Sequence, residues 1–232
     1  MTELVSYQFE DGIATLTLCN GKVNALSPAV FEALNAALDR AEQDRAIVIL
    51  TGQPGILSGG YDLKVMTSSP QNAMALVATG STFSRRMLAH PFPIIVACPG
   101  HAIAKGAFLL LSSDYRIGVE GGSKFAANEV AIGMTVPHFA IRVLRQRLTP
   151  QQLNKAVNFA HYFSTTEALQ AGIIDELTDP AELMAVARQR ATEALKLDAG
   201  AHASSKLRLR EVLLQDIARD IERDCEGWRQ AY

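Results

Sequence analysis

Two continuous apolar runs, each followed at once by a loop that contains glycine, constrain the fold of this chain more than any other feature. The runs read AIVILTG at 46–52 and IIVAC at 94–98. A short apolar run without polar alternation is typical of a strand that is buried on both faces. Glycines in the loops at 52–63 and 99–108 let a ligand approach the backbone closely. The sequence therefore predicts buried strands that lead into candidate binding loops.

Shorter patterns predict the other elements. Nearly alternating apolar and polar residues at 5–9 and 13–18 flank a turn and indicate an antiparallel strand pair. Ser27-Pro28 is typical of a helix N-cap and first helical position, and apolar residues follow at helical spacing through Gln43. Strand, strand, helix recurs in the first half, which favours an α/β fold. The remaining expected elements are strands at 114–119, 123–127 and 173–177, helices that begin at Thr149-Pro150 and Asp179-Pro180, and a helix over 204–228.

The helix expected over 204–228 carries an apolar stripe with charged residues elsewhere. Such a stripe needs a surface to pack on, either the core or an adjacent subunit. We therefore expect a core at 1–178 and a helical carboxyl-terminal region at 179–232. The residues of the stripe are Leu207, Leu214, Ile217, Ile221 and Trp228.

Composition narrows the classes of function. The 232 residues carry a formal net charge of −2, so nothing indicates a nucleic-acid or membrane surface. No apolar run approaches the ~20 residues that span a bilayer, and the amino end lacks a basic segment followed by an apolar one, so a cytoplasmic protein is expected. The three cysteines, like His90, His161 and His202, stand in no metal-ligand spacing, which predicts reduced thiols and no metal site.

The loop at 99–108 runs directly into a helix. Free amides at a helix start, with the positive end of the helix dipole behind them, hold an anion or a developing oxyanion without a charged side chain. Taken alone, this loop and the one at 52–63 are equally consistent with structural turns. Further motifs are needed to decide between the two interpretations.

Four stretches of the sequence supply these further motifs. Through them the sequence resembles the crotonase (enoyl-CoA hydratase/isomerase) superfamily over essentially its full length. The resemblance implies an α/β spiral of repeated strand-strand-helix units, with a helical carboxyl-terminal region that builds homotrimers or pairs of trimers. It also implies an acyl-CoA substrate and no cofactor beyond the CoA moiety. The matching stretches are KVNALS (22–27), VILTGQPGILSGGYDL (48–63), PIIVACPGHAIAKGAFLLLSSDYRIG (93–118) and KFAANEVAIGM (124–134).

Proteins of this family hold the thioester oxygen of an enolate-like intermediate with two backbone N–H groups. The resemblance places these donors at Ser58 and Lys105. Preorganised donors of this kind contribute ~3–4 kcal/mol each to the transition state. Lys105 departs from the glycine common in the family. Its side chain is either turned away into solvent without a role, or it reshapes the pocket.

The resemblance also implies a set of substrate contacts. Lys22, Val23 and Ala25 would lie along CoA, and Gly60, Asp62 and Leu63 near its adenine and pantetheine parts. Asp62 has an alternative interpretation as the cap of the next helix. The remaining expected contacts are Ala104, Gly106, Phe108, Asn128 and Gly133.

Hydratases of the family carry two glutamates around the bond that gains water. Here Phe108 occupies the first position and Glu129 the second. One carboxylate beside an oxyanion hole suits a proton shuttle, so the resemblance favours an enoyl-CoA isomerase with Glu129 as base. Burial would bring the pKa of Glu129 towards the working pH. A surface glutamate at a helix start is the alternative.

Other functions stay open from the sequence alone. The same fold serves hydratases, CoA-thioester hydrolases and decarboxylases, and a non-catalytic acyl-CoA-binding homologue is consistent with Phe108 and Lys105. His138 is either a second acid or base, or a structural residue at a helix end. The G-x-S-x-G elbow and the phosphate-binding glycine motifs are absent, which argues against a serine hydrolase and a nucleotide enzyme.

Overall fold

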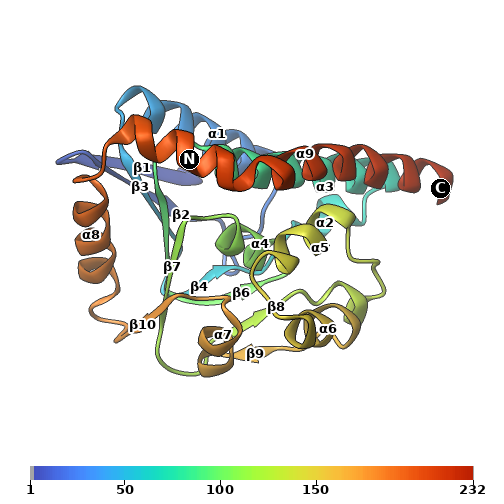
Figure 1. Ribbon diagram of the computed structural model, residues 1–232. Helices are drawn as coiled ribbons and strands as arrows, with labels where there is room; N and C mark the ends of the chain where they lie inside the picture. Colours follow the sequence, from blue (N-terminus) through green and yellow to red (C-terminus); the bar gives the residue numbers. More distant parts are fainter. Residues whose placement is uncertain (1–2, 232) are drawn as a thin grey trace.

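The computed structural model describes residues 3–231, with side chains as far as residue 227. Its strands form two sheets (Figure 1), a six-stranded sheet in the order β1-β2-β3-β5-β7-β10 and a four-stranded sheet in the order β4-β6-β8-β9. The strands are β1 Val5–Glu10, β2 Ile13–Leu18, β3 Ile47–Thr51, β4 Gly55–Ser58, β5 Ile94–Cys98, β6 Gly100–Ile103, β7 Tyr115–Val119, β8 Lys124–Ala126, β9 Phe163–Ser164 and β10 Glu176–Thr178.

Helices connect and cover the sheets. The helix starts predicted at Pro28 and Pro150 are confirmed, since the side chains of Ser27 and Thr149 accept hydrogen bonds from amides of the first turn. The helices are α1 Pro28–Gln43, α2 Leu63–Met66, α3 Pro70–Ala89, α4 Lys105–Leu111, the 3₁₀ helix η1 Glu129–Ile132, α5 His138–Arg145, α6 Pro150–Asn158, α7 Thr165–Ala171, α8 Leu183–Ala194 and α9 Ala199–Ala231.

Strands that follow one another in the sequence divide between the two sheets. β3, β5 and β7 lie next to each other in the large sheet, and β4, β6 and β8, which follow them along the chain, pair in parallel in the small sheet. Each repeat thus adds one strand to each sheet. This arrangement confirms the predicted α/β spiral of strand-strand-helix units.

The large sheet is covered on both faces, which explains the unbroken apolar runs of β3 and β5. Val48 and Val96 face the main core, whereas Ile49 and Ile95 belong to a second cluster beneath α8. Ala187 is one of the α8 residues that complete this second cluster. A strand covered on both faces is apolar at nearly every position.

Helix α9 packs along α3 and α5 at the edge of the molecule (Figure 1). Leu214 and Ile217 are buried as predicted, but Leu207, from the same predicted stripe, is 45% exposed. The side chain of Trp228 lies outside the described part of the chain. Within residues 3–231, none of the helices combines the length and apolarity that a membrane span requires.

The structure differs from the sequence prediction around 173–183. Only Glu176–Thr178 forms a strand, because Gly172 ends α7 with a φ of 81° and the chain then turns with Ile174 buried. Helix α8 begins at Leu183 rather than beside Pro180, since the Asp179 carboxylate accepts from the Ala181 amide within the preceding turn. Strand β10 ends at Thr178; beyond it, α8 packs on the large sheet and α9 on α3 and α5.

Candidate active site

The small sheet brings three loops together. Strands β4, β6 and β8 run parallel and end at Ser58, Ile103 and Ala126. The Ala104 amide donates to the Ala126 carbonyl at 2.7 Å, which ties the second loop to the third. Segments that leave parallel strands at their carboxyl ends meet at one edge of a sheet. Lys105 and Glu129, which follow these strands, are thereby placed in one region.

Glycines allow the start of α4 to press against the end of β4. A Cβ on Gly106 would lie 2.2 Å from the Ser58 carbonyl oxygen. A Cβ on Gly60, whose φ is +105°, would lie 3.0 Å from the Ala104 Cβ and 3.5 Å from the Lys105 amide nitrogen. No larger residue fits at Gly106 without movement of backbone. The close approach therefore depends on glycine at these two positions.

Backbone amides face this junction. The Lys105 amide opens α4 and has no acceptor within the helix. Ala104 precedes it with φ 49° and ψ −125°, a strained conformation for a residue other than glycine. Ser58 is completely buried, and its hydroxyl donates to the Asn24 carbonyl at 2.7 Å and accepts from the Gly60 amide.

The loop after Ser58 holds a second amide that the sequence interpretation did not consider. Tyr61 forms an isolated parallel bridge with Leu26. The Leu26 amide donates to the Gly60 carbonyl, and the Asp62 amide donates to the Leu26 carbonyl. In such a bridge the central residue directs its own N–H to the opposite side. The Tyr61 amide is thus directed away from Leu26.

Glu129 opens η1 and is only 7% exposed, so it is not the surface residue of the alternative interpretation. Its Oε2 is buried and has no hydrogen-bond partner within the described residues. Burial raises the pKa of Glu129 to about 7, and the charge of Lys105 opposes that rise. This carboxyl group therefore changes its protonation near neutral pH.

The Lys105 side chain turns into the protein instead of solvent. It is 1% exposed, and its Nζ donates to the Ser84 Oγ at 2.5 Å. The same nitrogen lies 5.0 Å from the centre of the Phe139 ring, within the range of a cation–π contact. Burial lowers the pKa of Lys105 to about 7, and the negative charge of Glu129 opposes that fall.

Phe108 belongs to the hydrophobic core. It is 2% exposed and packs on Phe139 at 5.7 Å between ring centres. The position that carries a carboxylate in two-glutamate hydratases is therefore apolar here. Glu129 has no carboxylate at Phe108 with which to hold a water molecule.

The expected CoA contacts form the outer part of the region. Lys22, Val23 and Leu63 are exposed, the last two at 47% and 69%. The Asp62 carboxylate accepts from the Lys64 amide at 2.8 Å and caps α2, as its alternative interpretation predicts.

The other expected contacts have structural partners. Ala25 accepts from the Asn20 side chain through its carbonyl at 2.6 Å, and Asn128 donates from its Nδ2 to the Tyr162 hydroxyl at 2.9 Å. Gly133 is exposed and ends η1 with a φ of 79°. These three residues lie in the loops around the site.

The sequence interpretation missed Asn24. It is fully buried with a φ of 47°, and its side chain donates to the Leu57 carbonyl at 3.0 Å. Its Oδ1 accepts from the Gln53 side chain at 3.0 Å. Asn24 therefore fixes the 22–25 loop against β4. The available signal was that asparagine tolerates a positive φ better than most residues do.

A cavity of about 350 Å³ is lined in part by Gly133 and Met134, which directly follow η1 in the sequence. The Met134 amide donates to the Glu129 carbonyl, so the cavity adjoins the segment that carries Glu129. His138 lies on its wall, and its Nδ1 is 2.6 Å from the Asp224 carboxylate, which also accepts from the His138 amide at 2.9 Å. Asp224 therefore caps α5. The residues that line the cavity are Val77, Gly133, Met134, Thr135, Val136, Pro137, His138, Arg223, Asp224 and Gly227.

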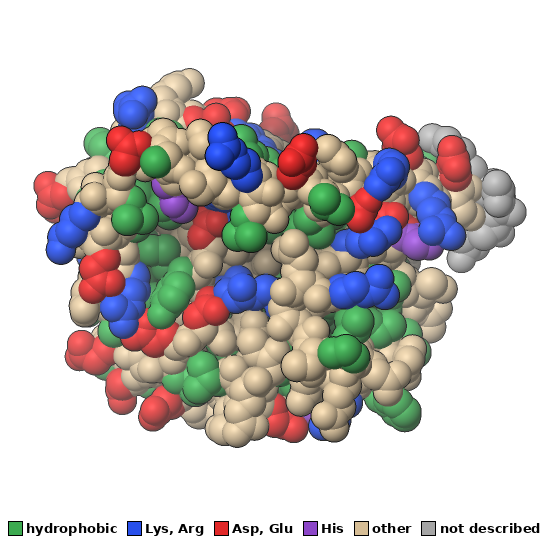
Figure 2. All heavy atoms as spheres, in the orientation of Figure 1, with side chains coloured by type: hydrophobic (Ala, Val, Ile, Leu, Met, Phe, Trp, Pro, Cys, Tyr) green, Lys and Arg blue, Asp and Glu red, His purple; other side chains and the backbone are tan. Residues whose placement is uncertain are grey.

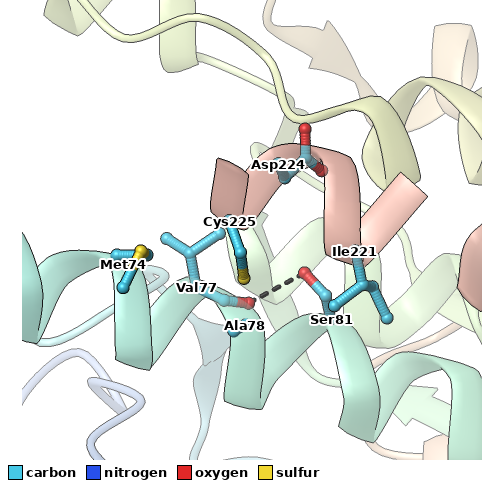
Figure 3. A pocket seen from close by; sticks show the side chains of 7 residues that line it. All are labelled: Met74, Val77, Ala78, Ser81, Ile221, Asp224 and Cys225. Atoms are coloured by element: carbon cyan, nitrogen blue, oxygen red, sulfur yellow. Dashed lines mark hydrogen bonds between the residues drawn. The ribbon is translucent and has the colours of Figure 1, made fainter. Parts of the chain in front are cut away.

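A smaller pocket lies between α3 and α9, as Figure 3 shows. Its volume of about 10 Å³ has room for one water molecule at most. Ser81 points towards it, while its hydroxyl donates to the Val77 carbonyl at 2.8 Å. Residues 3–231 contain no group of three histidine, cysteine or acidic side chains that could hold a metal ion.

Comparisons with known proteins agree with this geometry. The family model described as enoyl-CoA hydratase/isomerase matches residues 8–222. The crystal structure of a Pseudomonas syringae protein of that family is 57% identical, covers 96% of this chain and 97% of its own, and superposes with a TM-score of 0.95. The Mycobacterium tuberculosis enoyl-CoA isomerase is 40% identical over 97% of this chain and 99% of its own, with a TM-score of 0.93.

Curated relatives include both isomerases and hydratases. The mouse mitochondrial enoyl-CoA delta isomerase 1 is 25% identical over 97% of this chain and 80% of its own length. A probable enoyl-CoA hydratase of Bacillus subtilis is 30% identical over 82% of this chain and 75% of its own. The fold, the arrangement of loops and these matches lead to one conclusion: the chain belongs to the enoyl-CoA hydratase/isomerase family of enzymes.

Proposed function

We propose that this enzyme moves the double bond of an enoyl-CoA from the 3 to the 2 position, with Glu129 as the single proton carrier. The observation that carries this proposal is the buried Glu129 carboxyl group, whose Oε2 has no partner among the described residues. Phe108, at the other carboxylate position of two-glutamate hydratases, is apolar and packed in the core. One carboxylate without a second favours proton transfer between two carbons over addition of water.

In the proposed reaction, the Glu129 carboxylate takes a proton from C2 of the thioester. The C2–H bond breaks, and its electron pair moves towards the thioester oxygen. Glu129 then returns the proton to C4, which leaves the double bond between C2 and C3. Because burial raises the pKa of Glu129 to about 7, the carboxyl group both accepts and releases a proton near neutral pH.

Backbone amides stabilise the oxygen in this mechanism. We assign the Lys105 amide at the start of α4 as one donor, because it has no acceptor within the helix. The loop from Ser58 to Tyr61 supplies the other. Ser58 is the residue that the family resemblance indicates, and the Tyr61 amide is directed away from its bridge with Leu26. Each donor contributes about 3 kcal/mol to transition-state stabilisation.

The exposed Lys22, Val23 and Leu63 are the proposed CoA contacts. The acyl chain would then extend past Glu129 into the cavity of about 350 Å³, where Val136 lies on the wall. The substrate's CoA moiety is the one cofactor-like group that this reaction requires.

We also propose a homotrimer or a pair of trimers that acts in the cytoplasm. Large apolar side chains on the outer face of α9 support an assembly, with Leu209 at 82% and Val212 at 69% exposure. Figure 2 shows acidic and basic side chains interspersed with hydrophobic ones over one face of the molecule. Such a face suits contact with a protein better than contact with an anionic polymer.

Hydration is the second candidate reaction, because relatives such as the Bacillus subtilis protein are named probable enoyl-CoA hydratases. A hydratase would have to activate water with Glu129 alone. Hydrolysis or decarboxylation of a thioester, or acyl-CoA binding without chemistry, would use the same amides. The experiment below separates all of these.

The purified protein is incubated in heavy water with 3-enoyl-, 2-enoyl-, 3-hydroxyacyl- and malonyl-type CoA thioesters, and products are separated and weighed by mass spectrometry. We expect 3-enoyl-CoA to become 2-enoyl-CoA of the same composition apart from exchanged deuterium. Water addition, a free acid or loss of carbon dioxide would each select a rival reaction. Unchanged thioesters that nonetheless bind would indicate a non-catalytic binder.

The Glu129→Gln variant tests the proton carrier. Its kcat should fall about 100-fold or more, since general acid–base catalysis typically contributes 10²–10⁴-fold. Glu120→Gln is the matched control, because Glu120 is exposed and lies outside the site. Full turnover by the Glu129 variant would refute the mechanism.

A further inference from the structure

The Lys105 side chain is a buried charged group that the proposed mechanism does not use. Its ammonium group has three N–H donors, yet among the described residues it makes one hydrogen bond, to Ser84. Burial of an ammonium group costs free energy unless it is paired. An apolar side chain of the same length would fill this space without that cost, so packing alone does not account for a lysine.

Glu129 presents the complementary problem. Its buried Oε2 lacks a partner among the described residues, and the Lys105 Nζ donates to Ser84 instead. The two groups nevertheless sense each other, since each opposes the shift that burial imposes on the other. The backbone also brings them together, because β6 and β8 pair in parallel and the amide of Ala104, next to Lys105, donates to the Ala126 carbonyl at the end of the strand that leads to Glu129.

Among the described residues, Glu129 is the ionisable group that acts on Lys105, and Tyr61 is a second titratable group that acts with Glu129. Tyr61 comes from the loop before α2, and burial together with Glu129 raises its pKa, so it stays neutral near pH 7. Ser84 of α3 and Phe139 of α5 are uncharged. The charge of Asp224 on α9 also raises the pKa of Tyr61, but this carboxylate accepts from the His138 amide and caps α5.

We propose that the Lys105 ammonium group is the electrostatic partner of Glu129: it keeps the resting carboxylate ionised and offsets the negative charge of the enolate. The inference rests on the proposed isomerase function. When Glu129 takes the C2 proton, the negative charge moves from the carboxylate to the thioester oxygen. Lys105 keeps its own protons throughout, so the site stays neutral overall before and after transfer. Lys105 is thus a positioning residue that acts through charge.

This role requires Glu129 ionised and Lys105 protonated. The rate should therefore rise with pH as Glu129 loses its proton and fall at higher pH as Lys105 loses its own. Because Lys105 favours the ionised carboxylate, its removal should move the acid limb of the profile to higher pH by about one unit or more. The alkaline limb should disappear at the same time.

The test compares kcat and kcat/KM from pH 5 to 10 for wild type and for Lys105→Met, with 3-enoyl-CoA as substrate. At pH 7 we expect kcat to fall about tenfold or more, which corresponds to one pH unit of displacement, while KM changes little. Lys105→Arg retains the charge and should keep the acid limb near its wild-type position. Lys155→Met, which removes an exposed lysine on α6, is the matched control.

A second measurement does not depend on turnover. Infrared difference spectra follow the protonated Glu129 carboxyl band, identified by its loss in Glu129→Gln, as the pH of the substrate-free protein is varied. In Lys105→Met the band should persist to higher pH. An unchanged titration would overturn the inference even if the enzyme is an isomerase. A shifted titration in a protein that does not isomerise 3-enoyl-CoA would refute the proposed function and leave the charge coupling intact.

Discussion

At the scale of single residues, Lys105 and Glu129 place two ionisable groups in an apolar interior. Burial lowers the pKa of the first and raises that of the second, and both reach about 7. Each shift records a free-energy cost of keeping the charged form folded. Sites of this kind lower the stability of the fold for the sake of reactivity.

Lys105→Met should therefore stabilise the protein. A lysine whose folded pKa is depressed binds fewer protons than the unfolded chain, so its cost is present below about pH 7 and vanishes above its ordinary pKa of 10.5. At pH 6 the free energy of unfolding should rise by roughly 2–4 kcal/mol, and at pH 10.5 the gain should be small. Chemical denaturation at the two pH values measures this, and a loss of stability at pH 6 would contradict it.

At the scale of elements, two helices matter most: α4 places the Lys105 amide at the site, and α9 packs along α3 and α5. Helix α4 begins after Ala104, a non-glycine residue with φ 49° and no side-chain cap. Helix α9 is held by Asp114, which pairs with Lys206 at 2.6 Å and Arg210 at 2.9 Å. The start of α4 is strained and α9 is anchored by ion pairs. Relief of the strain should therefore raise the free energy of unfolding, and loss of the anchor should lower it.

Ala104→Gly should raise the free energy of unfolding by about 1 kcal/mol. Glycine occupies this conformation without a Cβ clash, and the relief of strain exceeds the extra entropy of the unfolded chain. The control is Ala75→Gly in the exposed interior of α3, which should lower stability by about 1 kcal/mol. Equal losses for both variants, measured by urea denaturation, would show that Ala104 is not strained.

Asp114→Ala should lower stability by about 3 kcal/mol or more. The substitution leaves Lys206, whose side chain is 4% exposed, without its carboxylate, and it also removes the acceptor of the Ile94 amide. Asp39→Ala breaks an exposed pair with Arg86 and should cost less than about 1 kcal/mol. Thermal unfolding of both variants compares the two, and similar losses would be inconsistent with anchoring by Asp114.

At the scale of the whole molecule, the two sheets have different roles. The large sheet and its two apolar layers supply most of the core, whereas the ends of β4, β6 and β8 in the small sheet supply the site. Helix α9 runs along α3 and α5 at one edge (Figure 1). Its outward-facing Leu209 and Val212 are exposed. These two described side chains are therefore open to water in a single chain.

Assembly follows as a prediction at this scale. Burial of Leu209 and Val212 in an interface would remove large apolar side chains from water. Sedimentation equilibrium at micromolar concentration should give three or six times the 25.1 kDa of one chain. A single-chain mass at that concentration would contradict the trimer.

Much of the fold followed from local patterns. The strands at 47–51 and 94–98 and the helix starts at Pro28 and Pro150 were predictable because strand burial and helix caps depend on adjacent residues. The strand expected at 173–177 was wrong in most of its length, since Ile174 is buried in a turn and not in a sheet. Apolar character alone does not distinguish the two.

The sequence by itself determined the two buried strands, the helix starts at Pro28 and Pro150, the glycine loops and the apolar residue at position 108. Only the tertiary structure decided that Lys105 points inward, because Ser84 and Phe139, which hold its ammonium group, come from distant helices. The burial of Glu129 and its proximity to Lys105 likewise depend on the parallel pairing of β6 and β8. Local sequence sets backbone preferences over a few residues, whereas the charge state of a side chain depends on everything that packs around it.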